Sequence, residues 1–242
     1  MQATARAGAP SPMIRIPMIR ILRLFTRLRN DRSGLALLEF AFGLPIFLVM
    51  TLTGAEMINY ITVKMRVGQL ALHLADNAAR MGNGSLQSAK TVSENDINDL
   101  LTGAGLQAGE LNLFERGRVI VSSLEVDPAN AGKYRIRWQR CRGAKVAHTS
   151  GYGVAGNNNL DGMGPNGRKV QAQDNNAVMF VEVYYEYFPL IGRGSLAPTA
   201  DFTEIASMSV RDRRDTSDDS NATPSLHPNG VYKVDGVTAS TC

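Results

Sequence analysis

The feature that most constrains this chain is an apolar segment near the N-terminus, residues 35–58, in which only Glu39 and Glu56 are charged. A helix of these 24 residues would rise about 36 Å, enough to cross a hydrocarbon core of about 30 Å. Residues 1–34 hold seven arginines and one acid. Because short arginine-rich flanks stay in the cytoplasm, the sequence predicts a single span with a cytoplasmic N-terminus and a translocated C-terminal part.

The pattern after the span is that of an amphipathic helix. Apolar and small residues recur at steps of three and four, which predicts that the helix continues to about residue 82, where Gly82 and Gly84 favour its end. The residues of this predicted stripe are Ile61, Met65, Gly68, Leu72, Ala75 and Ala79. The sequence therefore divides into a basic leader (1–34), a long helix (35–82) and a translocated domain (83–242).

Charge and cysteine content exclude several classes of protein. Although the net charge is +4, the 208 residues after the leader hold 19 basic and 21 acidic residues. A nucleic-acid-binding domain would carry its own basic face, so we expect no nucleic-acid partner. Two cysteines are too few for a zinc site of four cysteines or for a scaffold built on many disulfides.

The translocated domain is predicted to be α+β. Ser93 precedes acidic residues as at a helix start, and the hydrophobic period changes to two in 118–126, 133–139 and 178–187, with a fourth candidate strand at 205–210. A turn-rich segment, 127–132, joins the first two strands into a hairpin. In its second strand, Tyr134, Ile136 and Trp138 are predicted to face a core and Lys133, Arg135 and Arg137 to face water, with Arg140 and Arg142 extending the solvated basic stripe. We therefore expect a small antiparallel sheet with helices packed on it.

The Gly- and Asn-rich loop that follows, residues 143–173, contains two incomplete motifs. A calcium-loop beginning at Asn157 has Arg168 where a bidentate glutamate is needed, and a phosphate-loop spacing from Gly162 lacks its Lys-Ser/Thr pair. We expect a surface loop, and we leave calcium binding by it open. The three histidines have no patterned partners, so we expect no catalytic residues, no resident metal and no cofactor.

The residues at the start of the span carry a resemblance. Gly34 is followed by four apolar residues, Glu39 and Phe40, which is similar to the processing signature of type IV prepilins. The phrase ALLEFAFGLPIFLVM resembles the TadE/TadG-like pseudopilins of the tight-adherence pilus system. The resemblance covers about residues 28–80.

This resemblance implies a minor pilin-like subunit of the inner membrane that acts in pilus biogenesis or adhesion. Its expected partners are a prepilin peptidase, other pilins and pilus assembly proteins, and membrane lipid. The peptidase would cleave between Gly34 and Leu35. Glu39, with Phe40 beside it, would then set helix registry by pairing with the new α-amino group of Leu35 on an adjacent subunit. The exported domain would lie in the periplasm or on the pilus.

Three alternatives stay open at this point. Glu39 could snorkel to the cytoplasmic headgroups, and the chain could be an uncleaved single-span scaffold of an envelope assembly. The same residues could also form a secretory signal peptide with a small-residue cleavage site at Thr53-Gly54-Ala55, followed by a secreted hydrolase. The apolar run is longer than a usual signal peptide, and no hydrolase motif is present in the sequence.

The two cysteines, Cys141 and Cys242, both lie on the translocated side of the predicted span. An even number of cysteines in an oxidising compartment favours a disulfide between them. The bond would tie a polar, otherwise loose C-terminal tail, residues 211–242, to the second hairpin strand. A free C-terminal cysteine is the alternative.

Overall fold

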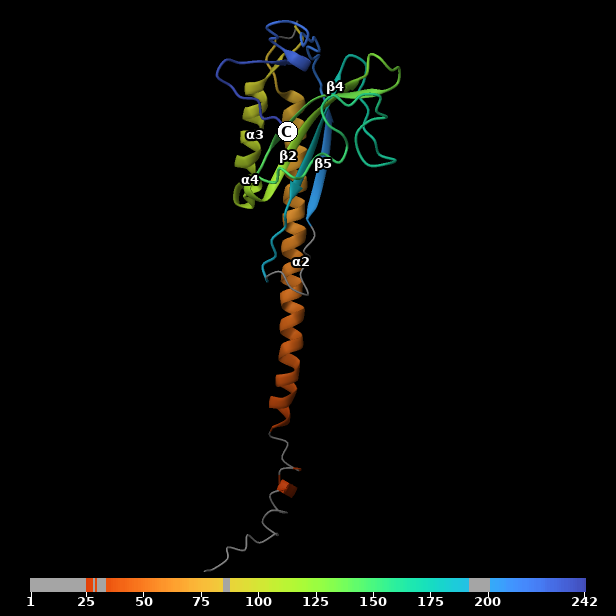
Figure 1. Cartoon of the computed structure of the whole chain (residues 1–242). Coiled ribbons are helices and arrows are strands. Elements are labelled where there is room, and N and C mark those ends of the chain that lie inside the picture. The colour runs from red at the N-terminus through yellow and green to blue at the C-terminus, as the bar shows by residue number, and fades with distance from the viewer. Residues whose placement is uncertain (1–24, 28, 30–33, 85–87, 192–200) are drawn as a thin grey trace, which may run out of the picture. The chain divides into compact units, whose positions relative to one another are not determined.

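The computed structural model describes residues 25–27, 29, 34–84, 88–191 and 201–242 (Figure 1). Most of the predicted leader lies outside these residues. The chain divides into two compact units, Met1–Leu52 and Thr53–Cys242. Helix α2 (Leu35–Arg80) contributes residues to both units, and Pro45 lies inside it.

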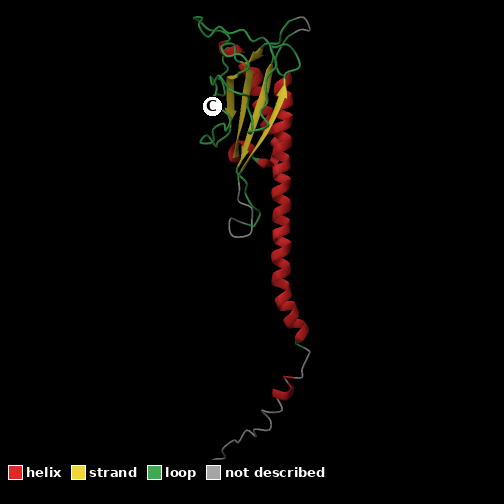
Figure 2. Cartoon of the chain, turned by 90° about the vertical axis from the view of Figure 1, so that its right-hand side faces the viewer, coloured by secondary structure: helices red, strands yellow, loops and turns green. Residues whose placement is uncertain are grey.

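The second unit contains a four-stranded antiparallel sheet in the order β3-β2-β4-β5. Its strands are yellow in Figure 2. Its strands are β2 (Gly117–Val126), β3 (Tyr134–Arg142), β4 (Ala177–Tyr185) and β5 (Phe202–Ser209). The described part of the chain also has α3 (Glu94–Ala108), η1 (Gly109–Leu111), α4 (Leu113–Arg116) and η2 (Pro228–Gly230). The predicted α+β class, a long apolar helix followed by a small antiparallel sheet, is confirmed.

One face of the sheet packs on α2 and α3 through a continuous apolar core. Ser93 and Asp96 form a capping box that starts α3, as the sequence predicts. The predicted stripe lies only in part on the side of α2 that contacts this core, since Ala75 and Ala79 are buried there. Ile61, Met65 and Leu72 are each about half exposed. The buried residues of α2 in this core are Val67, Leu70, Ala71, Leu74, Ala75, Ala78 and Ala79.

The opposite face of the sheet is covered by the Gly- and Asn-rich loop. Met163 and Ala172 from the loop are buried against Leu124, Ile136 and Phe180 in a second apolar core. Backbone bonds tie the loop to β3, including Tyr134 N–H to Leu160 O at 2.8 Å. The expected surface loop is thus a covering layer, and both faces of the sheet are buried.

An irregularity in the β2–β3 pairing changes which β3 side chains share a face. The register places Trp138 opposite Ser123 but Ile136 opposite Leu124, so Arg137 is an extra residue on β3. Trp138 therefore packs in the helical core and Ile136 in the loop-covered core. The prediction that both face one core was wrong, because strict alternation does not allow for an inserted residue.

The predicted solvated stripe of arginines was also wrong in part. Arg137 is buried and pairs with Glu125 at 2.9 Å. Arg140 faces the helical layer, where its Nε donates to Glu94 at 2.9 Å. These arginines join the sheet to α3 and to the C-terminal segment.

The C-terminal segment is packed on the domain rather than loose. Its strand β6 (Val231–Tyr232) pairs in parallel with β1 (Val92–Ser93). Buried Arg214 donates to the Met81 carbonyl at 3.0 Å and lies within 3.5 Å of the Ala78 and Ala79 carbonyls. A cation at a helix C-terminus satisfies carbonyls that have no intrahelical partner. The C-terminal segment thus caps α2 and aligns the start of α3.

Candidate functional site

The predicted processing segment lies at the start of α2. Gly34 is the residue before the helix, Leu35 is its first residue, and the Leu38 amide donates to the Gly34 carbonyl at 3.0 Å. Leu35 and Phe40 are more than half exposed, and Glu39 is exposed. The four-residue spacing of Leu35 and Glu39 places both on one helix face. A neighbouring helix that packs on this face would contact both side chains.

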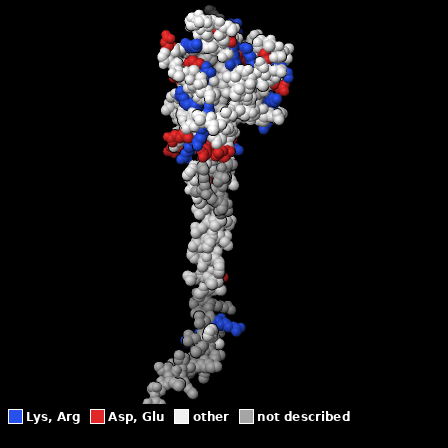
Figure 3. Space-filling model, in the orientation of Figure 1, with Lys and Arg blue, Asp and Glu red and all other residues white. Residues whose placement is uncertain are grey.

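The surface of α2 in the first unit is apolar and exposed. An 18-residue window of the helix has a mean hydropathy of 2.2 and none of its residues is buried. In the view of Figure 3, Lys, Arg, Asp and Glu side chains gather over the second unit, and the apolar part of α2 has almost none. The helix has the length and composition needed to cross a membrane, which fits the predicted span.

A buried carboxylate, Glu56, joins α2 to the segment that follows β4. Its side chain is 1% exposed and accepts a hydrogen bond from the Tyr187 hydroxyl. Its Oε2 accepts from the amides of Leu190 and Ile191 at 2.8 and 3.2 Å. Asn59 Nδ2 donates to the Tyr187 oxygen at 2.7 Å. Four hydrogen bonds therefore fix residues 187–191 against one turn of α2.

Sequence analysis assigned no role to Glu56. The available signal was its position, because a carboxylate at the end of an apolar segment needs a partner. Its partners lie more than a hundred residues further along the chain, so no local pattern identifies them. Aromatic contacts reinforce the junction: the Tyr60 ring packs edge-on against Tyr187 and Phe202, with ring centroids 5.0 and 5.7 Å apart.

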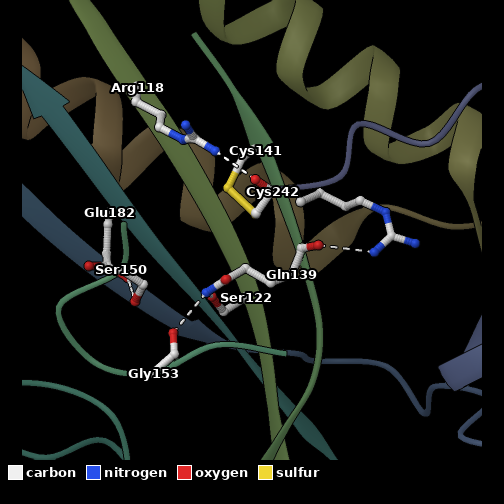
Figure 4. The surroundings of a disulfide bond; sticks show 9 residues. Arg118, Ser122, Gln139, Cys141, Ser150, Gly153, Glu182 and Cys242 are labelled. Atoms are coloured by element: carbon white, nitrogen blue, oxygen red, sulfur yellow. Dashed lines mark hydrogen bonds between the residues drawn. A yellow bond between two sulfur atoms is a disulfide. The ribbon is translucent and has the colours of Figure 1, made fainter. Parts of the chain in front are cut away.

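The disulfide between Cys141 and Cys242 predicted from the sequence is present (Figure 4). Cys141 lies in β3, at the edge of the sheet, and its amide donates to the Ser240 carbonyl at 2.8 Å. Arg118 donates to the Cys242 carbonyl at 3.1 Å. The bond therefore joins the edge strand to a C-terminal segment that hydrogen bonds already hold beside it.

Polar side chains on the same sheet face as the disulfide are engaged in structural contacts. Gln139 donates to the Ser122 hydroxyl at 2.9 Å and to the Gly153 carbonyl at 3.1 Å (Figure 4). The Ser150 hydroxyl donates to Glu182, which is 1% exposed. Burial raises the pKa of the Glu182 carboxyl, and the hydrogen bonds from Ser150 and the Gly151 amide oppose this rise. These contacts join the covering loop to the sheet.

Within the described residues, no three His, Cys, Asp or Glu side chains come together in an arrangement that could hold a metal ion. In the incomplete calcium motif, Asp161 pairs instead with Lys133 at 2.6 Å and with Lys169 at 3.5 Å. Both pairs are solvent-exposed and lower the pKa of Asp161. The negative charge of Asp161, the loop side chain best suited to bind a cation, is thus already balanced by two lysines.

Comparison of the sequence with protein-family models and with curated proteins, and of the fold with solved structures, finds no match in any of the three.

Proposed function

We propose that this chain is a minor pilin-like subunit of a tight-adherence pilus assembly, inserted in the inner membrane by α2 and cleaved between Gly34 and Leu35. The observation that carries the proposal is the pattern of residues 34–40 at the first turn of a long helix with an exposed apolar surface. Its function would be mechanical: the helix joins a bundle of helices and the sheet domain is displayed outside the cytoplasm.

The exposed stripe of α2 supports this proposal. Ile61, Met65 and Leu72 lie beyond the predicted span, on the helix surface that the sheet leaves uncovered, with exposed fractions of 48, 59 and 50%. An apolar stripe on a helix is a surface that a neighbouring helix can bury. The stripe extends the apolar surface of the span, so helices of adjacent subunits could pack along both.

The position of Glu39 supports a role in helix registry. A carboxylate in lipid costs about 3 kcal/mol on insertion scales, so it needs a partner or a route to water. Cleavage after Gly34 would create an α-amino group at Leu35, one helical turn before Glu39. In a bundle of such helices, the amine of one subunit can pair with the carboxylate of another, which fixes their relative height.

The direct test of cleavage is the mature N-terminus, measured by mass spectrometry of the chain purified from its own host. We expect Leu35 as the first residue, and Gly34→Leu should retain the leader. Gly43→Leu is the matched control, because an added Cβ meets no atom within 4 Å at either glycine, and it should be cleaved normally. A wild-type chain that still carries its leader arginines would favour the uncleaved scaffold.

A second test separates registry from snorkelling. Glu39→Gln should keep membrane insertion, protein level and cleavage, because the residue lies outside the scissile bond. Removing one partner of a buried ion pair costs about 3–5 kcal/mol, whereas an exposed pair contributes almost nothing. Co-purification with other pilus components should therefore fall sharply. Normal piliation in the variant would refute registry and leave the snorkelling explanation.

A further inference from the structure

The segment that follows β4, residues 187–191, is fixed at the level of the α2 turn that contains Glu56. Both the Leu190 and Ile191 amides donate to Glu56, as does the Tyr187 hydroxyl. Glu56 lies two residues before the last residue of the apolar segment 35–58. A core of about 30 Å needs about 20 helical residues, so the 24-residue segment places its C-terminal end at the membrane surface.

The side chains of this segment that are not used in the junction are apolar and exposed. Phe188, Leu190 and Ile191 are 56, 69 and 49% exposed. On α2 at the same level, Met57 and Ile58 are 47 and 68% exposed. Glu56, the charged residue of α2 at this level, is buried, and its carboxylate accepts hydrogen bonds from the segment itself. A second apolar surface therefore lies beside the end of the span.

One basic side chain next to this surface suits a phospholipid. Arg116, an exposed residue, places its guanidinium 5.2 Å from the centre of the Phe188 ring. Its carbonyl accepts the Glu186 amide at 2.9 Å, which holds α4 against the end of β4. Lys145 pairs with Glu186 and neutralises its carboxylate. An arginine beside exposed apolar side chains, at the depth of lipid headgroups, can contact a lipid phosphate.

We infer that residues 187–191 form a second membrane contact, lying in the headgroup region of the translocated leaflet with Phe188, Leu190 and Ile191 against the acyl chains. The inference rests on the membrane insertion of α2 proposed above. The inference gives Glu56 a role. Its carboxylate accepts hydrogen bonds from the backbone amides of Leu190 and Ile191, so that this non-helical segment enters the membrane surface with both amides hydrogen-bonded.

The test uses tryptophan emission from the full chain in nanodiscs that hold one copy each, made with ordinary or acyl-brominated phosphatidylcholine. The native Trp138 is 4% exposed and gives the background. Leu190→Trp and Phe188→Trp report on the segment. Ile58→Trp is the control for insertion of α2, and Leu106→Trp, at a position 79% exposed on α3, is the control for water.

We expect brominated lipid to reduce the added emission of Leu190→Trp and Phe188→Trp about twofold, as for a side chain in the acyl boundary. Ile58→Trp should respond at least as strongly, and Leu106→Trp should respond to aqueous iodide instead. If Ile58→Trp is quenched by lipid while both segment variants behave like Leu106→Trp, the inference is wrong and membrane insertion stands. If Ile58→Trp is not quenched either, insertion of α2 is refuted and the inference with it.

Nanodiscs that hold a single copy also distinguish lipid from a second subunit as the partner that covers residues 187–191. A second copy of this chain cannot reach it there, so lipid quenching in these discs supports a membrane contact. If the segment variants are shielded from iodide only in discs that hold two or more copies, the surface is an interface between subunits and the lipid contact is refuted.

Discussion

Opening the disulfide between Cys141 and Cys242 should lower the stability of the second unit strongly. The bond joins residues separated by 101 positions and closes a loop that contains β4, β5 and β6. In the chain-entropy model, a cross-link that closes about 100 residues stabilises by about 4.7 kcal/mol, and removal of native disulfides typically costs about 2–5 kcal/mol. For a unit of this size, 1 kcal/mol corresponds to about 2–4 °C, so the melting temperature should fall by roughly 10–20 °C.

The assay is thermal unfolding of the full chain in detergent, followed by circular dichroism. Cys141→Ser, Cys242→Ser and the double variant should give the same shift, because each removes the same cross-link. Wild-type protein treated with a reductant should match them. The hydrogen bond from the Cys141 amide to the Ser240 carbonyl does not involve the sulfurs, so the C-terminal segment can still pack. A shift of less than about 4 °C would refute the entropic argument, because it corresponds to less than the 2 kcal/mol lower bound.

Two further changes test the sheet and the start of α3. Burial raises the pKa of the Glu182 carboxyl, so the native state binds a proton at this carboxyl more tightly than the unfolded chain does. The free energy of unfolding therefore falls as the pH rises from the usual carboxyl pKa through the raised pKa of the native state. Glu182→Gln should remove that fall, so denaturant unfolding should show the variant gaining stability relative to wild type over this window; curves that stay parallel would contradict it. Ser93→Ala breaks the capping box with Asp96 and should cost about 1 kcal/mol in the same assay, whereas Gln107→Ala, at an exposed position of α3, should cost almost nothing.

The features that the sequence predicted well depend on local pattern. The apolar length of residues 35–58, the capping signal at Ser93 and the change of hydrophobic period to two each involve neighbours within a few positions. The disulfide followed from the number of cysteines and the predicted orientation. These signals were enough to predict the class of fold and the chain order of the four strands of the sheet.

The features that the sequence did not predict depend on contacts between distant residues. The extra residue Arg137 in β3 reverses the faces of Trp138 and Ile136, and its cause lies in the pairing with β2. The period of the predicted stripe did not show which side of α2 packs on the sheet: Ala75 and Ala79 are in the core, whereas Ile61, Met65 and Leu72 are exposed. The position of Glu56 in an apolar segment indicated that its carboxylate needs a partner, but the partners come from a segment after β4.

The parallel pairing of β1 with β6 has a consequence for the order of folding. Val92 pairs with Val231 and Ser93 with Tyr232, so the first and last strands of the second unit are neighbours. Contacts between such distant residues form late, because the loop-closure entropy must be overcome first. A chain that emerges N-terminus first therefore exposes β1 long before its partner is available. Loss of the last dozen residues, by premature termination or proteolysis, would remove β6 and the sulfur of Cys242 together.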